Sequence, residues 1–229
     1  PCYEVSMPVK SKFTAEDIID AAFLIVRSEG AEKCSARAIA HELNSSTMPI
    51  YSCLSSMKEL KEAVLKKALA LLISYETKVR TGDVLLDMGI GYIMFAKTEK
   101  HLFRMLFLSG SRGGSGDMRK RFNDYVVNAL LQKLSGFEPL NDFSQEQKRN
   151  LLNRMWVFTH GLAVLLNNSI IKDLSERQIA EMIMDTGIFV ILGERMRREI
   201  YVSPEVKTFL ERSGYPHLGQ RQAVDFDLF

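Results

Sequence analysis

The chain has 229 residues, of which 46% are hydrophobic and 25% charged, a composition typical of a folded, water-soluble protein. Its formal net charge of +2 does not favour a nucleic-acid partner, so such a partner would have to meet a local patch. No apolar run approaches the roughly 18 residues that a membrane-spanning helix needs, so we expect no membrane partner.

The cysteines are Cys2, Cys34 and Cys53. Their number is odd, they form no CxxC pair, and no histidine cluster lies near them in the sequence, which argues against a disulfide framework or a zinc site. We therefore expect a protein of the reducing cytoplasm that holds no metal and no cofactor.

Residues 1–12 show no hydrophobic periodicity, which predicts a flexible N-terminal arm. Thr14, followed by acidic residues, is a typical helix N-cap, since its hydroxyl can accept from a first-turn N–H and the acidic residues face the positive end of the helix. The helix is predicted to run to about Glu29 and to end at Gly30. Its core face recurs at helical spacing: Ile18, Ala21, Ala22, Ile25 and Val26.

The stretch Ser35–Leu60 has the pattern of two short helices joined by a tight turn and followed at once by a longer helix. Ser35 is a good N-cap for the first of them. Asn44 marks the turn, because asparagine is the residue besides glycine that best tolerates a left-handed backbone. We expect Ser46 to cap the second helix. The residues that this helix would bury are Ile50, Cys53 and Leu54.

The opposite face of the second helix is short-chained, polar and free of acidic residues, which suits the major groove of DNA. Together with the helix before them, the two short helices form a predicted helix-turn-helix head over residues 13–55. The segment from Lys33 to Lys61 holds four basic and two acidic side chains, a net charge of only +2. An ordinary helical hairpin inside a bundle would have the same spacing, so the pattern alone leaves both interpretations open.

Ser55 or Ser56 is expected to cap a long helix that runs to about Lys78 and connects the head to the rest of the chain (residues 56–78). Beyond it the pattern stays helical, without the alternation typical of strands and without a hairpin signal. The chain is therefore predicted to be all-α, with about nine helices. The further helices are expected at about 83–97, 100–109, 116–135, 145–169 and 175–198.

Residues 56–200 would then form a larger helical domain, and residues 201–229, which contain two prolines and two glycines, a largely irregular tail. The loop SGSRGGSG at 109–116 lacks the GKS or GKT ending of a phosphate-binding loop and follows no strand. The sequence also lacks a nucleophile elbow, a motif of paired carboxylates and a His/Cys constellation. We therefore do not expect an enzyme.

The N-terminal part resembles the TetR family of helix-turn-helix transcriptional repressors over about residues 13–60. The resemblance lies in the spacing of the whole pattern, and the residues that carry it are Thr14, Ile18, Ala21, Gly30, Ser35, Ile39, Ala40, Leu43, Ser46, Ile50, Tyr51, Leu54, Ser56, Glu59 and Leu60. It implies a repressor that binds palindromic double-stranded operator DNA as a homodimer. It also implies that the larger domain dimerises and that a small molecule entering it releases the DNA.

The sequence departs from the family pattern at four positions. Asn44 stands where the family often has glycine, Ser45 where it often has a small apolar residue, and Leu54 where phenylalanine is common. Pro49 lies within the second short helix, where a mid-helix proline would cost about 3 kcal/mol. If Ser46 is the cap, however, Pro49 falls in the first turn, where its missing N–H is no loss.

The candidate DNA contacts lie on the second short helix and at the starts of its neighbours. Threonine and serine hydroxyls can bond base edges, while methionine and proline side chains can contact a thymine methyl. The resemblance assigns Tyr51 to a phosphate, and Lys58 would add positive charge beside a helix N-terminus. Plain surface exposure is the alternative for each of them. The full set is Ser35, Arg37, Ser46, Thr47, Met48, Pro49, Tyr51, Ser52 and Lys58.

Aromatic and methionine residues are dense in the larger domain, and as a group they fit an adaptable pocket for a small apolar or aromatic ligand. Each of them alone is more often an ordinary core residue. The candidate ligand-binding residues are Met88, Tyr92, Phe95, Phe103, Phe122, Tyr125, Trp156 and His160.

The last two helices are the expected dimer faces, where Gly161, Gly187 and Gly193 would let helices approach closely. The apolar residues beside these glycines are Leu162, Leu165, Leu166, Ile183, Ile188, Val190 and Ile191. A second function stays open, because the nearly neutral head also suits a helical protein-interaction adaptor without sequence-specific DNA binding.

Overall fold

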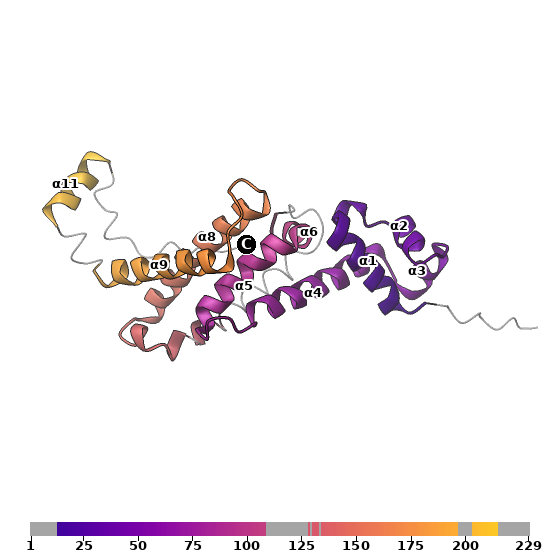
Figure 1. Ribbon diagram of the computed structural model, residues 1–229, viewed down its shortest axis with the longest axis horizontal. Coiled ribbons are helices and arrows are strands. Elements are labelled where there is room, and N and C mark those ends of the chain that lie inside the picture. The colour runs from indigo at the N-terminus through magenta and orange to yellow at the C-terminus, as the bar shows by residue number, and fades with distance from the viewer. Residues whose placement is uncertain (1–12, 109–127, 129, 133, 197–202, 215–229) are drawn as a thin grey trace, which may run out of the picture. The chain divides into compact units, whose positions relative to one another are not determined.

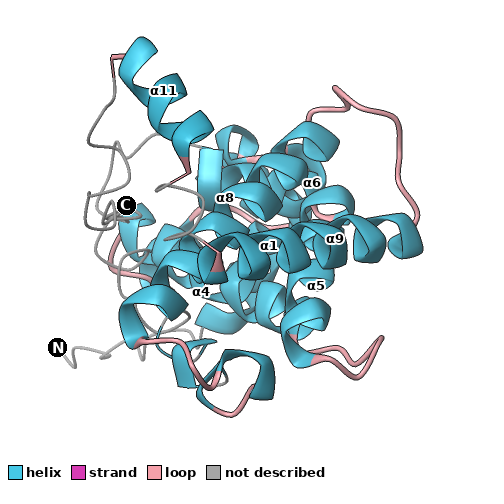
Figure 2. Ribbon diagram, turned by 90° about the vertical axis from the view of Figure 1, so that its left-hand side faces the viewer, coloured by secondary structure: helices cyan, strands magenta, loops and turns pink. Residues whose placement is uncertain are grey.

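The computed structural model describes residues 13–108, 128, 130–132, 134–196 and 203–214, and the regular structure in these ranges is helical, without strands (Figures 1 and 2). The predicted all-α class is confirmed. The arm at 1–12, the glycine-rich loop at 109–116 and most of the helix expected at 116–135 lie outside the described residues.

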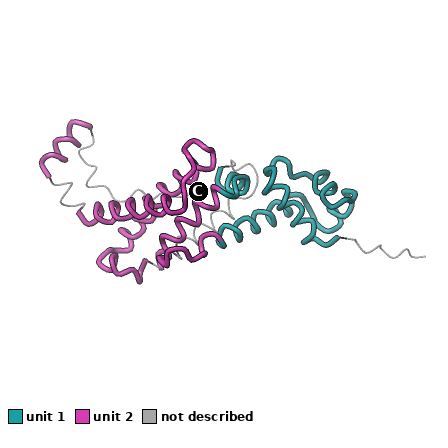
Figure 3. Tube along the Cα trace, in the orientation of Figure 1, with its two compact units in different colours: residues 1–74, 98–110 teal, residues 75–97, 111–229 magenta. Residues whose placement is uncertain are grey.

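The chain divides into two compact units (Figure 3). Unit 1 comprises residues 1–74 and 98–110, and unit 2 comprises residues 75–97 and 111–229. The segment predicted as a DNA-binding head therefore belongs to a larger unit, which also holds most of the long connecting helix and a short segment that follows the next helix.

Unit 1 contains the helices of the predicted head and three further helical segments. Their bounds are α1 Ala15–Glu29, a 3-10 turn Ala31–Lys33, α2 Ala36–Glu42, α3 Met48–Cys53, α4 Met57–Glu76, α6 Lys100–Phe103 and a π-helical turn Arg104–Leu108. Both α2 and α6 pack against α1. The helix expected at 100–109 is thus divided into an α-helical and a π-helical part.

Helix α1 begins and packs as its sequence predicts. The Thr14 hydroxyl accepts from the Asp17 N–H at 3.2 Å, and the Asp17 carboxylate accepts from the Thr14 N–H at 2.8 Å, which completes a capping box. The helix ends at Gly30, whose φ of +102° suits glycine. The predicted core face is buried throughout: Ile18, Ala21, Ala22, Ile25 and Val26.

Unit 2 is built from longer helices. Their bounds are α5 Val84–Thr98, a 3-10 turn Glu138–Leu140, α8 Gln145–Asn167, α9 Glu176–Arg195 and α11 Pro204–Arg212. Helices α8 and α9 pack side by side (Figure 1) and each begins with a serine capping box, at Ser144 and Ser175. A small core cluster near the start of α8 contains Leu134, Leu140, Phe143 and Leu151.

The prediction of a largely irregular tail is wrong for residues 204–212, which form α11. The Ser203 hydroxyl accepts from the Val206 N–H at 3.4 Å, and Pro204 occupies the first turn, where its missing N–H costs nothing. Pro204 thus begins a helix, because it follows a serine cap. The rest of the tail, 215–229, lies outside the described residues.

The described residues contain neither a candidate membrane span nor a candidate metal cluster. None of their helices combines the length and the apolar character needed to cross a membrane. No group of three or more His, Cys, Asp or Glu side chains among them is arranged to hold a metal ion.

Candidate DNA interface and candidate ligand site

The turn between α2 and α3 has the backbone that its sequence predicts. Ser35 caps α2 by accepting from the Ala38 N–H at 3.2 Å. Asn44 adopts a φ of +47°, in the left-handed region, and the following Ser45 N–H donates to the Ala40 carbonyl at 2.8 Å. The side chains of Ile39 and Ala40 are buried, so α2 is fixed in unit 1 on this face.

Helix α3 begins one residue later than predicted. Thr47, and not Ser46, is its N-cap, and the Thr47 side chain makes no capping hydrogen bond. The reason is Pro49. If Ser46 were the cap, its hydroxyl would accept from the backbone N–H of the third helical residue, which is Pro49, and proline has no N–H. Pro49 nevertheless falls in the first turn of α3, as expected.

The two faces of α3 differ sharply. Ile50 and Leu54 are buried, at 2% and 7% exposure, and they anchor the helix to the core of unit 1. On the other face, Met48 is 76% exposed and Tyr51 is 63% exposed. Cys53, expected inside, is only half-buried, and its thiol donates to the Phe13 carbonyl at 3.3 Å.

The hydroxyl proton of Ser52 is already used inside α3, where it donates to the Pro49 carbonyl at 3.0 Å. A base contact by Ser52 would therefore use its acceptor lone pairs. Thr47 and Pro49 are half-buried. The other polar candidates lie exposed at the ends of the helices: Ser35, Arg37, Ser46 and Lys58.

The start of α4 carries an acid that reduces its attraction for a phosphate. Ser56 caps the helix by accepting from the Glu59 N–H at 3.2 Å, and the Glu59 carboxylate in turn accepts from the N–H and hydroxyl of Ser55 at 2.8 and 2.5 Å. The bonds from Ser55 lower the pKa of Glu59, which is therefore ionised at neutral pH. A carboxylate thus lies one residue from Lys58, the predicted phosphate contact.

Three of the predicted ligand-binding residues meet in unit 2. The Tyr92 hydroxyl of α5 and Nδ1 of His160 on α8 share a hydrogen bond of 2.8 Å. The ring of Trp156 stacks on His160 with a centroid distance of 4.7 Å and an angle of 8°. Burial lowers the pKa of His160, so its imidazole is neutral at pH 7 and above. Burial also raises the pKa of Tyr92.

The other predicted ligand-binding residues do not join this group. Phe103 belongs to unit 1, where it is fully buried and packs on Phe107 with a centroid distance of 5.1 Å. Phe95 is also fully buried and meets Tyr75 edge to face. Met88 is half-buried. Phe122 and Tyr125 lie outside the described residues.

Sequence reasoning missed Glu76, the last residue of α4, which is only 9% exposed. Within the described residues, no hydrogen bond or ion pair reaches its carboxylate. Burial raises the pKa of this carboxyl group to about 8. The sequence does contain a signal for this buried acid, because position 76 lies four residues after the buried Leu72 and thus on the same face of the helix.

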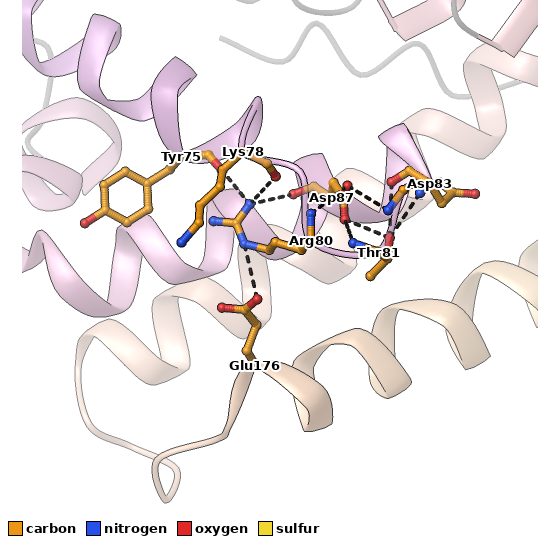
Figure 4. Close-up of polar contacts among 8 residues, drawn as sticks. Tyr75, Lys78, Arg80, Thr81, Asp83, Asp87 and Glu176 are labelled. Carbon is orange, nitrogen blue, oxygen red and sulfur yellow. Dashed lines mark hydrogen bonds and ion pairs between the residues drawn. The ribbon is translucent and has the colours of Figure 1, made fainter.

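Arg80 closes the C-terminal end of α4 (Figure 4). Its Nη1 donates to the carbonyl oxygens of Tyr75 and Lys78 at 2.8 and 2.9 Å, so a cation satisfies the last carbonyls of the helix. Its Nε lies 3.4 Å from the Glu176 carboxylate at the start of α9.

Asp87 organises the loop between α4 and α5 (Figure 4). Its carboxylate accepts from the backbone N–H groups of Arg80, Thr81 and Gly82 and from the Thr81 hydroxyl, at 2.7–3.2 Å. Desolvation opposes ionisation of Asp87, but these hydrogen bonds outweigh it and lower the pKa to about 2. The ionised Asp87 carboxylate therefore holds the loop in place, and its role is structural.

A scan against protein-family models found no match, and a search of curated proteins found no relative at significant similarity.

Proposed function

We propose that the protein is a transcriptional regulator, a repressor that binds a palindromic operator as a dimer and is released by a small molecule bound in unit 2. The observation that carries the proposal is the division of α3 into two faces. Ile50 and Leu54 fix the helix to unit 1, while Met48 and Tyr51 extend into solvent. Such a helix can enter a major groove without losing its anchorage.

The chemistry of the exposed face of α3 supports recognition of DNA through thymine methyl groups and through the shape of the duplex. Full burial of a methionine side chain is worth about 1.5–3 kcal/mol, and a thymine methyl offers Met48 such a contact. The face carries no Arg or Asn for a bidentate base contact, so specificity would depend partly on DNA shape.

Exposed apolar residues on α8 and α9 support dimerisation through these helices. Phe189 is 73% exposed, and Val157, Ile188 and Leu192 are exposed by 46–49%. A Cβ at Gly161 would meet nothing within 4 Å, so this surface is open to another helix. Other residues expected at the dimer face, Leu162, Leu166 and Ile183, are instead buried in their own chain.

The test is selection of a binding site from random duplex DNA by the full chain, followed by a salt titration on the selected sequence. We expect a palindrome with half-sites one helical turn or a multiple of it apart. Affinity should be on the order of 10⁻⁸ M or better and should fall steeply as salt rises. Phe189→Asp should give monomers in sedimentation and weaken operator binding.

The second candidate, a protein-interaction adaptor, is favoured by the same exposed Met48 and Tyr51 next to a nearly neutral segment. An adaptor would select no sequence from the pool. Sequence-blind or salt-insensitive binding, or no binding at all, would overturn the repressor proposal.

A further inference from the structure

Glu76 lies in a position that is unfavourable for a carboxylate. It is the last residue of α4, and the C-terminal end of a helix carries partial negative charge that repels an anion. It is also buried, and burial of an ionised group without a partner is costly. A side chain in this place is stabilised only by a proton or by a cation.

Among the described residues, the charged and titratable groups near Glu76 are bonded to other partners, exposed or neutral. Lys78, the nearest cation in the sequence, is exposed. Arg80, the next one, donates to carbonyl oxygens at the end of α4 and contacts Glu176 and Asp87. Asp87 is itself an anion. Tyr92 on α5 and His160 on α8 are also titratable, and burial favours the neutral form of both.

Helix α5 brings an aromatic group to this carboxylate. At Gly91 the backbones are so close that a Cβ would lie 2.6 Å from Glu76 Cα and 2.2 Å from the Tyr75 carbonyl oxygen. The next residue, Tyr92, is buried, and the negative charge of Glu76 contributes to raising its pKa. The Tyr92 hydroxyl is hydrogen-bonded to His160, and the ring of Trp156 stacks on His160.

The four side chains differ in burial. Glu76 and Tyr92 are buried, whereas Trp156 and His160 are half-buried, so the group borders on the surface of unit 2 at α8. Aromatic faces attract cations, and the attraction grows when water is excluded. A buried carboxylate next to aromatic rings therefore matches a ligand that is both cationic and apolar.

We propose that Glu76, Tyr92, Trp156 and His160 form a binding site for a lipophilic organic cation, such as a quaternary or protonated amine with an aromatic body. The carboxylate of Glu76 neutralises the charge, and the rings contact the apolar part. That this cation is the inducer rests on the function proposed above, whereas its binding to unit 2 does not require DNA.

The experiment uses the full chain without DNA and a pair of probes of the same shape, phenyltrimethylammonium and tert-butylbenzene. They differ in charge alone, since the quaternary nitrogen of one is a carbon in the other. Trp156 is the only tryptophan of the chain, so its fluorescence reports directly on the site. We expect saturable quenching by the cation and at least tenfold weaker binding of the neutral probe.

Glu76→Gln keeps the shape of the side chain and removes its charge. This variant should bind phenyltrimethylammonium at least tenfold more weakly than the wild type and should bind tert-butylbenzene equally well or better. The control is Glu146→Gln, which removes an exposed carboxylate from α8 of the same unit and should leave both affinities unchanged.

The pH profile of the wild type is a second readout that needs no variant. The cation binds the ionised form of Glu76, so its affinity should rise about tenfold per pH unit below the pKa of about 8 and become constant above it. In Glu76→Gln this dependence should be absent.

Equal affinity of the cation for wild type and Glu76→Gln would overturn the proposal. So would a preference for tert-butylbenzene, or a failure of the cation to change the fluorescence of Trp156 between pH 7 and 9. These outcomes differ from a failure of the proposed function, which shows in the DNA selection and not in this assay.

Discussion

Arg27 and Glu99 form a bidentate ion pair in unit 1, although 72 residues separate them in the sequence. Nε and Nη2 of Arg27, near the end of α1, lie 2.7 and 2.5 Å from the two carboxylate oxygens of Glu99. Glu99 is the N-cap residue of α6 and its side chain is only 3% exposed. The pair therefore joins the end of α1 to the start of α6, the short helix that packs on it.

Arg27→Ala should weaken unit 1, because it leaves the Glu99 carboxylate buried without its main partner. We expect a loss of about 2 kcal/mol, below the 3–5 kcal/mol typical of fully buried pairs, since the Arg27 side chain is 45% exposed. Hydrogen exchange measured by mass spectrometry on peptides from α1 and α6 should speed up by roughly 30-fold. Lys66→Ala, at an exposed position of α4, is the control, and equal exchange in the two variants would contradict the prediction.

Gly91→Ala should destabilise unit 2. The added Cβ would lie 2.2 Å from the Tyr75 carbonyl oxygen, and backbone cannot give way as a side chain can. A cost of about 3 kcal/mol is expected, measured as a lower urea midpoint of Trp156 fluorescence.

Gly161→Ala is the matched control for Gly91→Ala. It adds the same methyl group to a helix position with nothing within 4 Å, so it should stabilise the isolated chain by about 0.5–1 kcal/mol. If Gly161 lies in the dimer interface as proposed, the same variant should weaken dimerisation in sedimentation. A destabilisation equal to that of Gly91→Ala would refute the packing argument.

Asp87→Asn should lower the stability of unit 2 in a pH-dependent manner. The pKa of Asp87 is lowered from 3.8 to about 2 in the folded protein, so its ionised form stabilises the fold above pH 4, and this contribution is lost as the pH falls towards 2. The urea midpoint of the variant should therefore lie below that of the wild type at pH 7, and the two should converge between pH 4 and 2. A constant difference over this range would exclude the role assigned to the Asp87 charge. Asp185→Asn, at an exposed site of α9, should show no such convergence.

Glu76→Gln should stabilise unit 2 at neutral pH. Because the pKa of Glu76 is raised from 4.5 to about 8, the folded state keeps a proton that the unfolded chain releases, and stability falls as the pH rises from 4.5 to 8. The variant should gain up to about 3 kcal/mol at pH 7 and nothing at pH 4.5, measured by urea unfolding of Trp156 fluorescence. If wild type and variant have the same pH profile, Glu76 is not the buried acid described here.

Pro49→Ala and Tyr51→Ala should affect DNA binding in different ways. Pro49 occupies the first turn of α3, so alanine should leave the helix folded and change the base preference at one position of the selected site. Tyr51→Ala should weaken binding to all sequences alike, by about tenfold, if its hydroxyl contacts a phosphate. Tyr51→Phe separates the hydroxyl from the ring. A change in base preference with Tyr51→Ala would contradict the phosphate role.

Local sequence was sufficient for the features that depend on a few neighbouring residues. The capping box of Thr14, the cap at Ser35 and the left-handed turn at Asn44 follow from side-chain chemistry within one helical turn. The buried face of α1 follows from helical periodicity. The cap of α3 is Thr47 and not the expected Ser46 for an equally local reason, because Pro49 lacks an N–H.

Tertiary structure decided which distant residues meet. Phe103 and Trp156 are both aromatic residues in apolar helical stretches of the sequence. Phe103 nevertheless lies in the core of unit 1, whereas Trp156 lies in the aromatic group of unit 2. The pairing of Tyr92 with His160 joins residues 68 positions apart. Periodicity shows which face of a helix is apolar, but not which helix covers that face.

Glu76 shows both contributions in one residue. Its sequence position, four residues after Leu72, already placed an acid on the buried face of α4. Only the close approach of α5 at Gly91 brought this acid near enough to Tyr92 to raise the pKa of the phenol, and only the folded chain determined that no cation of the described residues pairs with it. The sequence by itself determined an all-helical chain in which a left-handed turn joins two short helices, because these features depend on local hydrogen bonds and spacing. The environment of a buried charge depends on every helix around it, so the tertiary structure alone decides it.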